Sequence, residues 1–278
     1  MAPNGRAWTE RYGPWAVVAG ASEGIGAAFA RALAARGLNL VLVARRAAPL
    51  EALAGELASR HGVETRALAL DLAQPESLAA LLSGIRDLEV GLLVWNAAYS
   101  LIGPFLDQPL DGHLRELEVN CRAPLSLVHH LGREMVGRRR GGIILMTSLS
   151  GMQGTALVAH YAATKAWNRV LAEGLWWELG KSGVDVLACV AGATDTPGYR
   201  ASEPAGGKAS KVPVMHPDAV VEETLGALGR TPSLIPGRRN RWAAALLVRL
   251  LPRRVAVRIM GKTMDSLYGP PGGSGSMP

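Results

Sequence analysis

The feature that most constrains the fold is a regular alternation, between residues 15 and 190, of short apolar runs with longer amphipathic stretches. The short runs are almost continuously apolar, which is typical of parallel strands covered on both faces. They predict strands at residues 15–19, 38–44, 64–70, 90–95, 142–147 and 184–190.

The stretches between these runs carry apolar residues at helical spacing. Ile25, Phe29 and Leu33 recur every fourth residue and would form one buried stripe. We expect helices at residues 25–36, 49–60, 75–86, 110–136 and 159–181. Strands that alternate with helices of this length predict an α/β fold, a doubly wound parallel sheet with right-handed crossovers.

After residue 190 the pattern loosens. Residues 193–213 contain three prolines and three glycines and are expected to form a long loop. A helix is expected at residues 217–228 and a short strand at residues 233–235. The Gly/Ser/Pro-rich residues 270–278 are expected to be unstructured.

The first predicted strand runs into a glycine-rich turn and then into a helix. The turn contains Gly20, Gly24 and Gly26, spaced GxxxGxG. A glycine turn at a helix N-terminus presents free N–H groups and the positive end of the helix dipole to a diphosphate. The turn therefore indicates a dinucleotide site, although three glycines at this spacing also occur in plain turns.

The end of the second predicted strand distinguishes between the nicotinamide coenzymes. A carboxylate near this position usually binds the adenosine ribose of NAD. Here the strand ends in Arg45 and Arg46 instead, and two guanidiniums suit the 2′-phosphate of NADP(H). The alternative is that this pair is solvated and only opens the next helix.

Composition excludes several classes of protein. Only two cysteines, Cys121 and Cys189, are present, so a disulfide scaffold is excluded and a reducing compartment such as the cytoplasm is favoured. His129 and His130 have no third ligand at metal spacing, and no metal site is predicted. We expect neither a signal peptide nor a membrane span, because no sufficiently long apolar segment is present.

The net charge of +7 is local. Nine basic residues and no acidic residue lie between Thr224 and Met264, so the rest of the chain sums to −2. In this segment Arg254, Arg258 and Lys262 recur every fourth residue and predict a basic amphipathic helix. Such a helix can cap a substrate cleft, contact an anionic membrane surface, or do both, whereas no nucleic-acid motif accompanies it.

Tyr161 and Lys165 begin a predicted helix and, four residues apart, share one face of it. An ammonium group one turn from a phenol is expected to lower the tyrosine pKa, so that the phenol exchanges protons near neutral pH. The pair alone is not specific, because tyrosines and lysines at this spacing are common.

Further motifs make the pattern specific. Over residues 13–236 the chain resembles the classical branch of the short-chain dehydrogenase/reductase family, of the NADP-preferring type. Ser148 lies thirteen residues before Tyr161, as the family's catalytic serine does. The matching residues, in the family's order and spacing, are Gly20-Ala21-Ser22-Glu23-Gly24-Ile25-Gly26, Asp71-Leu72, Asn96-Ala97, Asn120, Ser148, Tyr161 with Lys165, and Gly192-x-Thr194-x-Thr196.

The resemblance implies a role for each matching residue. Tyr161 would be the general acid in reduction and the base in oxidation, and Ser148 would hydrogen-bond the substrate oxygen. Lys165 would lower the tyrosine pKa and hold the nicotinamide ribose, and Asn120 would anchor a water that links Lys165 to solvent. The residues expected to bind NADP(H) are Gly20, Ser22, Glu23, Gly24, Ile25, Gly26, Arg45, Arg46, Asp71, Leu72, Asn96, Ala97, Tyr161, Lys165, Thr194 and Thr196.

Three positions depart from the family pattern without removing a catalytic group. Ala19 replaces a threonine before the glycine turn, and Ala98 replaces a glycine after Asn96. Ala191 replaces a proline, which bears on how rigidly the Thr194–Thr196 segment is held over the nicotinamide.

The resemblance also implies the architecture. The fold would be Rossmann-type, with a seven-stranded sheet in the order 3-2-1-4-5-6-7, in a homodimer or homotetramer that pairs the Tyr161 helix with its symmetry mate. Trp176 and Trp177 are expected at that interface, and Trp167 in the core. We divide the chain into a dinucleotide-binding and catalytic domain at residues 1–236, a basic helical extension at 237–269 and a disordered tail at 270–278.

The sequence thus predicts an NADP(H)-dependent oxidoreductase that interconverts a carbonyl and an alcohol, on a bulky hydrophobic substrate such as a steroid, a long-chain acyl compound or a polyketide-like ketone. Two other classes stay open. One is a non-catalytic NADP-binding regulator or scaffold, against which the intact Asn120, Ser148, Tyr161 and Lys165 argue. The other is a peripheral membrane-binding protein whose basic extension is its main functional part.

Overall fold

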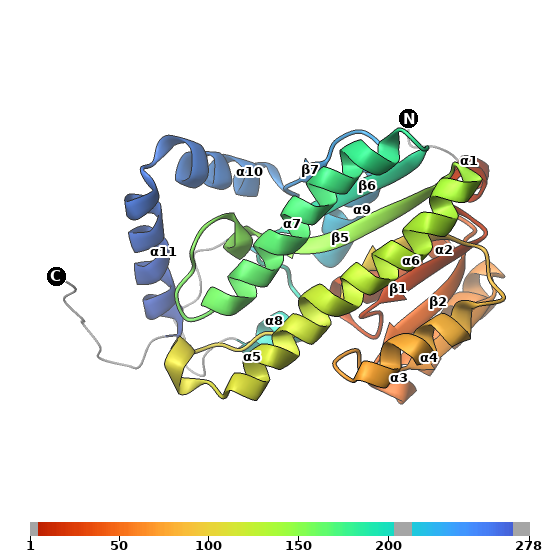
Figure 1. The fold of residues 1–278 in the computed structure, drawn as a ribbon, viewed down its shortest axis with the longest axis horizontal. Coiled ribbons are helices and arrows are strands. Elements are labelled where there is room, and N and C mark those ends of the chain that lie inside the picture. Colours follow the sequence, from red (N-terminus) through yellow and green to blue (C-terminus); the bar gives the residue numbers. More distant parts are fainter. Residues whose placement is uncertain (1–4, 203–212, 269–278) are drawn as a thin grey trace.

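The computed structural model describes residues 5–202 and 213–268. Its centre is a parallel seven-stranded sheet in the order β3-β2-β1-β4-β5-β6-β7 (Figure 1), which confirms the expected order. The strands are β1 Trp15–Ala19, β2 Asn39–Ala44, β3 Thr65–Ala69, β4 Val90–Trp95, β5 Gly141–Ser148, β6 Val184–Ala191 and β7 Ser233–Leu234.

Helices cover both faces of this sheet, so the doubly wound α/β prediction is confirmed. The α-helices are α1 Gly5–Tyr12, α2 Gly24–Ala34, α3 Ala47–His61, α4 Pro75–Ile85, α5 Leu110–Leu117, α6 Ala123–Arg138, α7 Ala159–Gly180, α8 Pro197–Ser202, α9 Pro217–Ala227, α10 Arg238–Ala245 and α11 Arg253–Tyr268. Two 3₁₀ turns, η1 Phe105–Asp107 and η3 Leu149–Met152, and two π turns, η2 Glu118–Arg122 and η4 Leu246–Leu250, complete the set.

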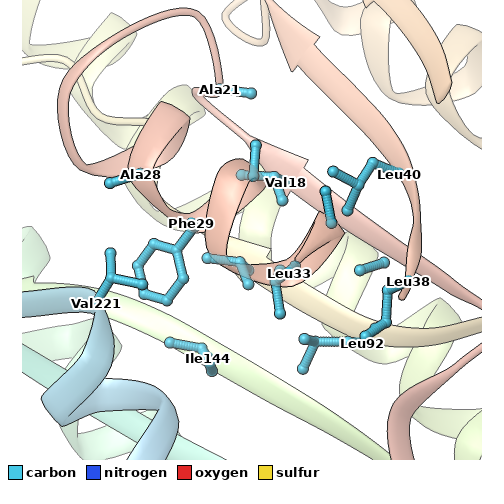
Figure 2. Close-up of a cluster of buried hydrophobic side chains, with 14 of the residues drawn as sticks. Val18, Ala21, Ala28, Phe29, Leu33, Leu38, Leu40, Leu92, Ile144 and Val221 are labelled. Atoms are coloured by element: carbon cyan, nitrogen blue, oxygen red, sulfur yellow. The ribbon is translucent and has the colours of Figure 1, made fainter. Parts of the chain in front are cut away.

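Each face of the sheet has its own apolar core. On one face α1, α2, α3 and α9 pack against the strands, and Phe29 and Leu33 of the predicted stripe are fully buried there. Figure 2 shows Phe29 between Val221 of α9 and Ile144 of β5. On the other face α4, α6 and α7 cover the strands. This two-sided burial explains why the strand segments are almost continuously apolar.

One predicted helix, at residues 110–136, is interrupted. The structure has α5, the π turn η2 and α6 in its place. Asn120 lies in that π turn, and its carbonyl accepts a 2.7 Å hydrogen bond from the side-chain amide of Asn168 on α7. A side chain that hydrogen-bonds to a carbonyl of a helix interrupts the regular backbone hydrogen bonds there. Such π turns often mark functional sites.

The segment after β6 also differs from the expectation. The predicted loop at residues 193–213 contains helix α8, which begins one residue after Thr196; residues 203–212 lie outside the described part of the chain. The hydroxyl of Thr196 accepts a hydrogen bond of 3.1 Å from the Tyr199 N–H and so caps this short helix.

The C-terminal extension consists of α10, η4 and α11, which lie at one end of the molecule beyond α7 (Figure 1). The helix predicted here is present as α11, with Arg254, Arg258 and Lys262 exposed as expected. Of its apolar residues Ala256 and Met264 are buried, whereas Val257 is exposed. The predicted tail at residues 270–278 lies outside the described residues. Within the described ranges, the helices are too short or too polar to cross a bilayer.

Candidate active site

A cleft of about 610 Å³ opens where β1, β2 and β4 end. The strand order reverses between β1 and β4, and ligands of open α/β sheets bind at such a switch point, beyond the carboxyl ends of the strands. The structure brings most of the predicted coenzyme residues to this cleft: Gly20, Ser22, Glu23, Gly24, Ile25, Arg45, Arg46, Asp71, Leu72, Asn96, Ala97, Tyr161 and Thr196.

The glycines of the turn are required by its geometry. Gly20 and Gly24 have positive φ angles of 79° and 57°, which side chains rarely allow. A Cβ atom on Gly26 would lie 1.9 Å from the Gly20 carbonyl oxygen. Asn96 donates a 3.0 Å hydrogen bond to that same oxygen, so the turn is held against the end of β4. The cradle therefore fits the diphosphate of a dinucleotide.

The close packing at Gly26 gives a stability prediction. We expect Gly26→Ala to lower the free energy of unfolding by about 1–3 kcal/mol, because the methyl group displaces the turn, and to weaken coenzyme binding. Gly55, in the middle of α3 with nothing within 4 Å of an added Cβ, is the matched control. There alanine is expected to stabilise the protein by about 0.5–1 kcal/mol. Urea denaturation measures both, and equal effects at the two positions would contradict the prediction.

Charged residues converge at the adenosine end of the cleft. Arg45 and Arg46 both line it, and Arg46 forms a 2.5 Å ion pair with Glu23 of the glycine turn. Burial favours a higher pKa for Asp71, but hydrogen bonds from the Ala73 N–H and from Arg115 outweigh it, so the Asp71 pKa is lowered. Asp71 is therefore an anionic acceptor at neutral pH.

Several cleft residues were not predicted from the sequence. The most prominent is Arg115 of α5, which pairs with Asp71 at 2.6 Å and lies 5.3 Å from the centre of the Tyr99 ring. No local pattern marks it, because Asp71 and Arg115 are brought together only by the fold. The other unpredicted lining residues are Ala44, Leu70, Ala98, Tyr99, Ser100, Val119, Gly198 and Tyr199.

The predicted catalytic groups lie at the other end of the cleft. Ser148 is the last residue of β5, and Tyr161 and Lys165 belong to the first two turns of α7. The Lys165 ammonium lies 5.5 Å from the centre of the Tyr161 ring and donates a 3.0 Å hydrogen bond to the Met146 carbonyl. Tyr161 is hydrogen-bonded to Ser148. Of these three residues Tyr161 lines the cleft, and its contacts place Ser148 and Lys165 next to it.

Burial dominates the protonation of this pair. It raises the Tyr161 pKa to about 12; the charge of Glu116 acts in the same direction, and the hydrogen bond with Ser148 opposes it. Burial also lowers the Lys165 pKa to about 8. The direction for Tyr161 is opposite to the lowering expected from the Tyr–Lys spacing, because burial of the phenolate and the charge of Glu116 outweigh the hydrogen bond with Ser148.

The Lys165 pKa predicts a pH dependence of stability. Below pH 8 the lysine is protonated in both the folded and the unfolded chain, whereas between about 8 and its ordinary value of 10.5 the unfolded chain binds more protons. Stability rises with pH wherever the unfolded state binds more protons. We expect the unfolding free energy of wild type, minus that of Lys165→Met, to rise by about 1–3 kcal/mol from pH 8 to 10. Urea titrations of the coenzyme-free proteins measure this difference; a flat difference would contradict the pKa.

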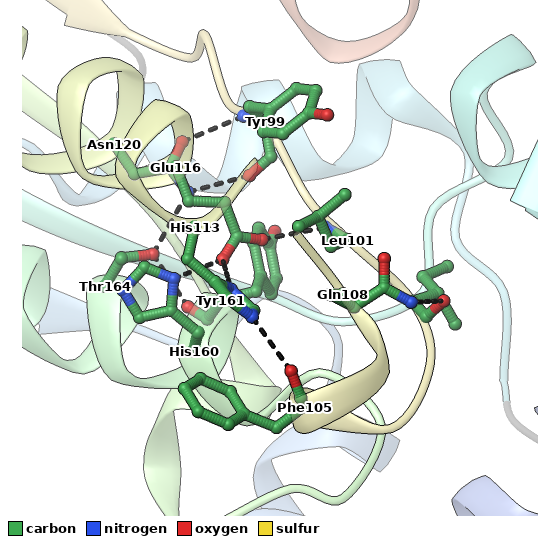
Figure 3. Close-up of polar contacts among 11 residues, drawn as sticks. Tyr99, Leu101, Phe105, Gln108, His113, Glu116, Asn120, His160, Tyr161 and Thr164 are labelled. Atoms are coloured by element: carbon green, nitrogen blue, oxygen red, sulfur yellow. Dashed lines mark hydrogen bonds and ion pairs between the residues drawn. The ribbon is translucent and has the colours of Figure 1, made fainter. Parts of the chain in front are cut away.

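The side chain of Asn120, next to the catalytic residues, makes three hydrogen bonds. Its side-chain oxygen accepts from the Tyr99 N–H at 2.8 Å, and its amide donates to the Tyr99 carbonyl at 2.8 Å and to Thr164 at 3.0 Å (Figure 3). Asn120 therefore joins the strand-end segment after β4 to helix α7. Its expected role as a water anchor stays a prediction.

Thr194 is placed differently from Thr196. It is buried, donates a 3.0 Å hydrogen bond to the Gly192 carbonyl and forms a bridge with Met215. Of the two threonines expected over the nicotinamide, Thr196 lines the described cleft. Thr194 supports the segment from behind.

Comparisons with known proteins agree with this geometry. The family model of short chain dehydrogenases matches residues 14–205. A 7beta-hydroxysteroid dehydrogenase of Collinsella aerofaciens is 33% identical over 234 residues, which cover 84% of this chain and 89% of that protein. The chain therefore belongs to the short-chain dehydrogenase family and is an oxidoreductase, as predicted.

Solved structures show the same likeness. One, described under structural and biochemical insights into 7beta-hydroxysteroid dehydrogenase stereoselectivity, has a TM-score of 0.86 and 31% identity and covers 91% of this chain and 98% of its own. A short-chain dehydrogenase from Sphingobium yanoikuyae, solved in complex with NADPH, has a TM-score of 0.74 and 33% identity and covers 83% of this chain and 91% of its own. The NADPH complex agrees with NADP(H) as the predicted coenzyme.

Proposed function

We propose that this chain is an NADP(H)-dependent oxidoreductase that interconverts a bulky hydrophobic ketone or aldehyde and the corresponding alcohol. One observation carries the proposal: a single cleft joins the guanidiniums of Arg45 and Arg46 to the phenol of Tyr161. The family and the NADPH complex of a relative support the coenzyme.

When bound, NADP(H) supplies or accepts the hydride. In the reductive direction the Tyr161 hydroxyl donates its proton to the carbonyl oxygen as that oxygen gains negative charge. The Ser148 hydroxyl donates a hydrogen bond to the same oxygen. Lys165 holds the nicotinamide ribose and supplies a positive charge beside the phenol, and the glycine turn with Asn96 holds the diphosphate.

The substrate class rests on the relatives and on the C-terminal extension. Several relatives are named as 7beta-hydroxysteroid dehydrogenases. In this chain α11 packs against the segment that follows Ser148: Arg253 donates a 3.1 Å hydrogen bond to the Met152 carbonyl, and the Val257 side chain lies near Gly154. The extension thus borders the side on which a substrate reaches Tyr161, which supports a steroid or similar ketone.

The test is oxidation of NADPH by the purified protein with a panel of steroid, long-chain acyl and polyketide-like ketones, each repeated with NADH. We expect turnover with NADPH and a bulky ketone. Tight NADPH binding without turnover of any member of the panel would favour the non-catalytic regulator.

Removal of α11 tests its role at the substrate side. In a chain that ends at residue 252, kcat/KM for the bulky ketone is expected to fall by at least about tenfold, because apolar contacts with the substrate are lost. Its Kd for NADPH should not change, because the residues that line the coenzyme cleft all precede residue 200. An unchanged kcat/KM would contradict a substrate role for α11.

The extension also has the character of a membrane-contacting surface. Trp242, Leu246 and Leu250 are exposed by 75%, 52% and 73% and recur every fourth residue. Arg254 and Arg258 of α11 are exposed nearby in sequence. Apolar and basic groups together favour contact with anionic lipid headgroups. Binding to anionic vesicles at low salt, lost at high salt and in a chain that ends at residue 241 and so lacks these apolar and basic groups, would support this contact; no binding at low salt would exclude it.

The proposed oligomer is a homodimer or homotetramer formed through α7. Trp167, expected in the core, is 36% exposed, and Val170 and Trp177 on the same side of α7 are exposed by 61% and 63%. Trp176, expected at the same interface, packs against the core instead. The proposed interface therefore keeps Trp177 and adds Trp167, because large apolar side chains in one stripe usually mark a contact surface. Sedimentation should show wild type as a dimer or tetramer and Val170→Glu as a smaller species. A monomeric wild type would contradict the proposed oligomer.

A further inference from the structure

Three titratable side chains meet beside Tyr161 without taking part in the proposed hydride transfer. His113 and Glu116 come from α5, and His160 comes from the first turn of α7 (Figure 3). One nitrogen of each histidine and one oxygen of Glu116 all lie within 4.8 Å of one another. The three residues share no local motif, since the fold brings His160 to the other two.

Hydrogen bonds to the backbone fix how His113 and Glu116 are oriented. The Nε2 atom of His113 lies 3.2 Å from the Phe105 carbonyl oxygen, which can only accept, so Nε2 carries the hydrogen. In the neutral ring the Nδ1 lone pair is then free. The Glu116 Oε1 atom accepts from the Leu101 N–H at 2.8 Å, which leaves Oε2 for the interior of the cluster.

The polar atoms at the interior of the cluster lie close together. His113 Nδ1 is buried without a hydrogen-bond partner among the described residues and lies 3.7 Å from Glu116 Oε2. His160 Nδ1 lies 2.5 Å from the same oxygen. The His113 side chain is only 10% exposed, and Glu116 is fully buried. The His113 Nδ1 lone pair and the Glu116 carboxylate thus meet in a buried space, where a positive charge between them would stabilise both.

We propose that His113 Nδ1, Glu116 Oε2 and His160 Nδ1 bind a divalent transition-metal ion of the Zn²⁺ type. Two imidazole nitrogens and one carboxylate oxygen are a donor set that zinc accepts, with bonds of about 2.0–2.2 Å. Tetrahedral bonds of that length place ligand atoms about 3.3–3.6 Å apart. The observed separations from Glu116 Oε2, 2.5 and 3.7 Å, lie on either side of this range.

The surroundings match those of a metal site. Metal-binding histidines usually donate their other ring N–H to a carbonyl or carboxylate, and ligating carboxylates are hydrogen-bonded in turn. His113 has this contact with Phe105, and Glu116 has it with Leu101. The ion would fasten α5 and the segment from Leu101 to Phe105 to the start of α7, one residue from Tyr161.

The alternative is a metal-free cluster in which protonated histidines pair with Glu116. The two are distinguished by titrating Zn²⁺ into the full-length, tag-free, chelator-treated protein in a calorimeter. The variants are His113→Gln and His160→Gln. His130→Gln is the matched control, because it removes an exposed histidine that faces a carboxylate, Glu134, at 3.4 Å on α6.

We expect one equivalent of Zn²⁺ to bind per chain of wild type and of His130→Gln. In His113→Gln and His160→Gln the affinity for Zn²⁺ should fall by at least about 100-fold. Zn²⁺ should raise the melting temperature of wild type and of His130→Gln but not that of the other two variants. No stoichiometric uptake by wild type would overturn the proposal, as would uptake that His113→Gln and His160→Gln leave unchanged.

A spectroscopic measurement keeps the test valid if the variants fail to fold. Co²⁺ added to the chelator-treated wild type should give the intense visible absorption of a four- or five-coordinate site, and Zn²⁺ should abolish it. The weak spectrum of six-coordinate Co²⁺ would overturn the proposal. Neither result depends on hydride transfer, so the metal site and the proposed activity can fail separately.

Discussion

Replacing Tyr161 with phenylalanine is expected to lower kcat for ketone reduction by about 10²–10⁴-fold, the usual contribution of a general acid. The phenyl ring still fills the position at the end of the cleft, so the Kd for NADPH should hardly change. Of the two groups proposed to contact the carbonyl oxygen, only the Ser148 hydroxyl is left. Steady-state kinetics and NADPH fluorescence titration measure the two quantities.

A second tyrosine of the same cleft provides the control. Tyr199 of α8 also lines the cleft, and Tyr199→Phe removes a hydroxyl without removing the proposed acid. We expect its kcat to fall by less than tenfold. Equal losses in the two variants would mean that Tyr161 acts through packing or binding and not through its proton.

The second large effect concerns the choice of coenzyme. The double variant Arg45→Ala, Arg46→Ala is expected to raise the KM for NADPH by about 10–100-fold, because losing hydrogen bonds between charged groups costs about 1.5–3 kcal/mol in total. The KM for NADH should stay the same or fall. Removal of Arg46 also releases Glu23 from its ion pair, and the freed carboxylate would repel a 2′-phosphate.

Arg60 provides the control for a change of charge. It is exposed near the far end of α3 and does not line the cleft. Arg60→Ala should leave both KM values unchanged. If the double variant raised the KM for NADPH and for NADH equally, the two arginines would not distinguish the coenzymes. They would then be only solvated residues at the start of α3.

The fold and the coenzyme turn could be predicted because their signals are local. The bounds of β1 and β4 match the apolar runs at residues 15–19 and 90–95, since strands covered on both faces need uninterrupted apolar residues. Gly20, Gly24 and Gly26 lie within seven residues of one another, so one short turn carries the whole signal.

Features that depend on contacts distant in sequence could not be predicted. The break of the helix at residues 110–136 involves Asn168, whose side-chain amide donates a hydrogen bond to the Asn120 carbonyl. The cluster of His113, Glu116 and His160 joins two separate helices, so the spacing of the histidines along the chain does not indicate the proposed metal site. Trp167 looked like a core residue by type, but only its place on α7 reveals its exposed side.

The pKa of Tyr161 illustrates the same limit at the site itself. The spacing of Tyr161 and Lys165 on one helix face indicates attraction between phenolate and ammonium. How deeply the phenol is buried, and that Glu116 lies close enough to act on it, emerge only from the folded chain. Desolvation then decides the direction of the shift.

The most direct test of the central claim is to follow the hydride itself. NADPH deuterated at the transferring position of the nicotinamide is incubated with the protein and a bulky steroid ketone, and the product alcohol is analysed by mass spectrometry. We expect one deuterium on the new carbinol carbon with wild type and almost none with Tyr161→Phe. NADPH that binds tightly but transfers no deuterium to any ketone of the panel would contradict it.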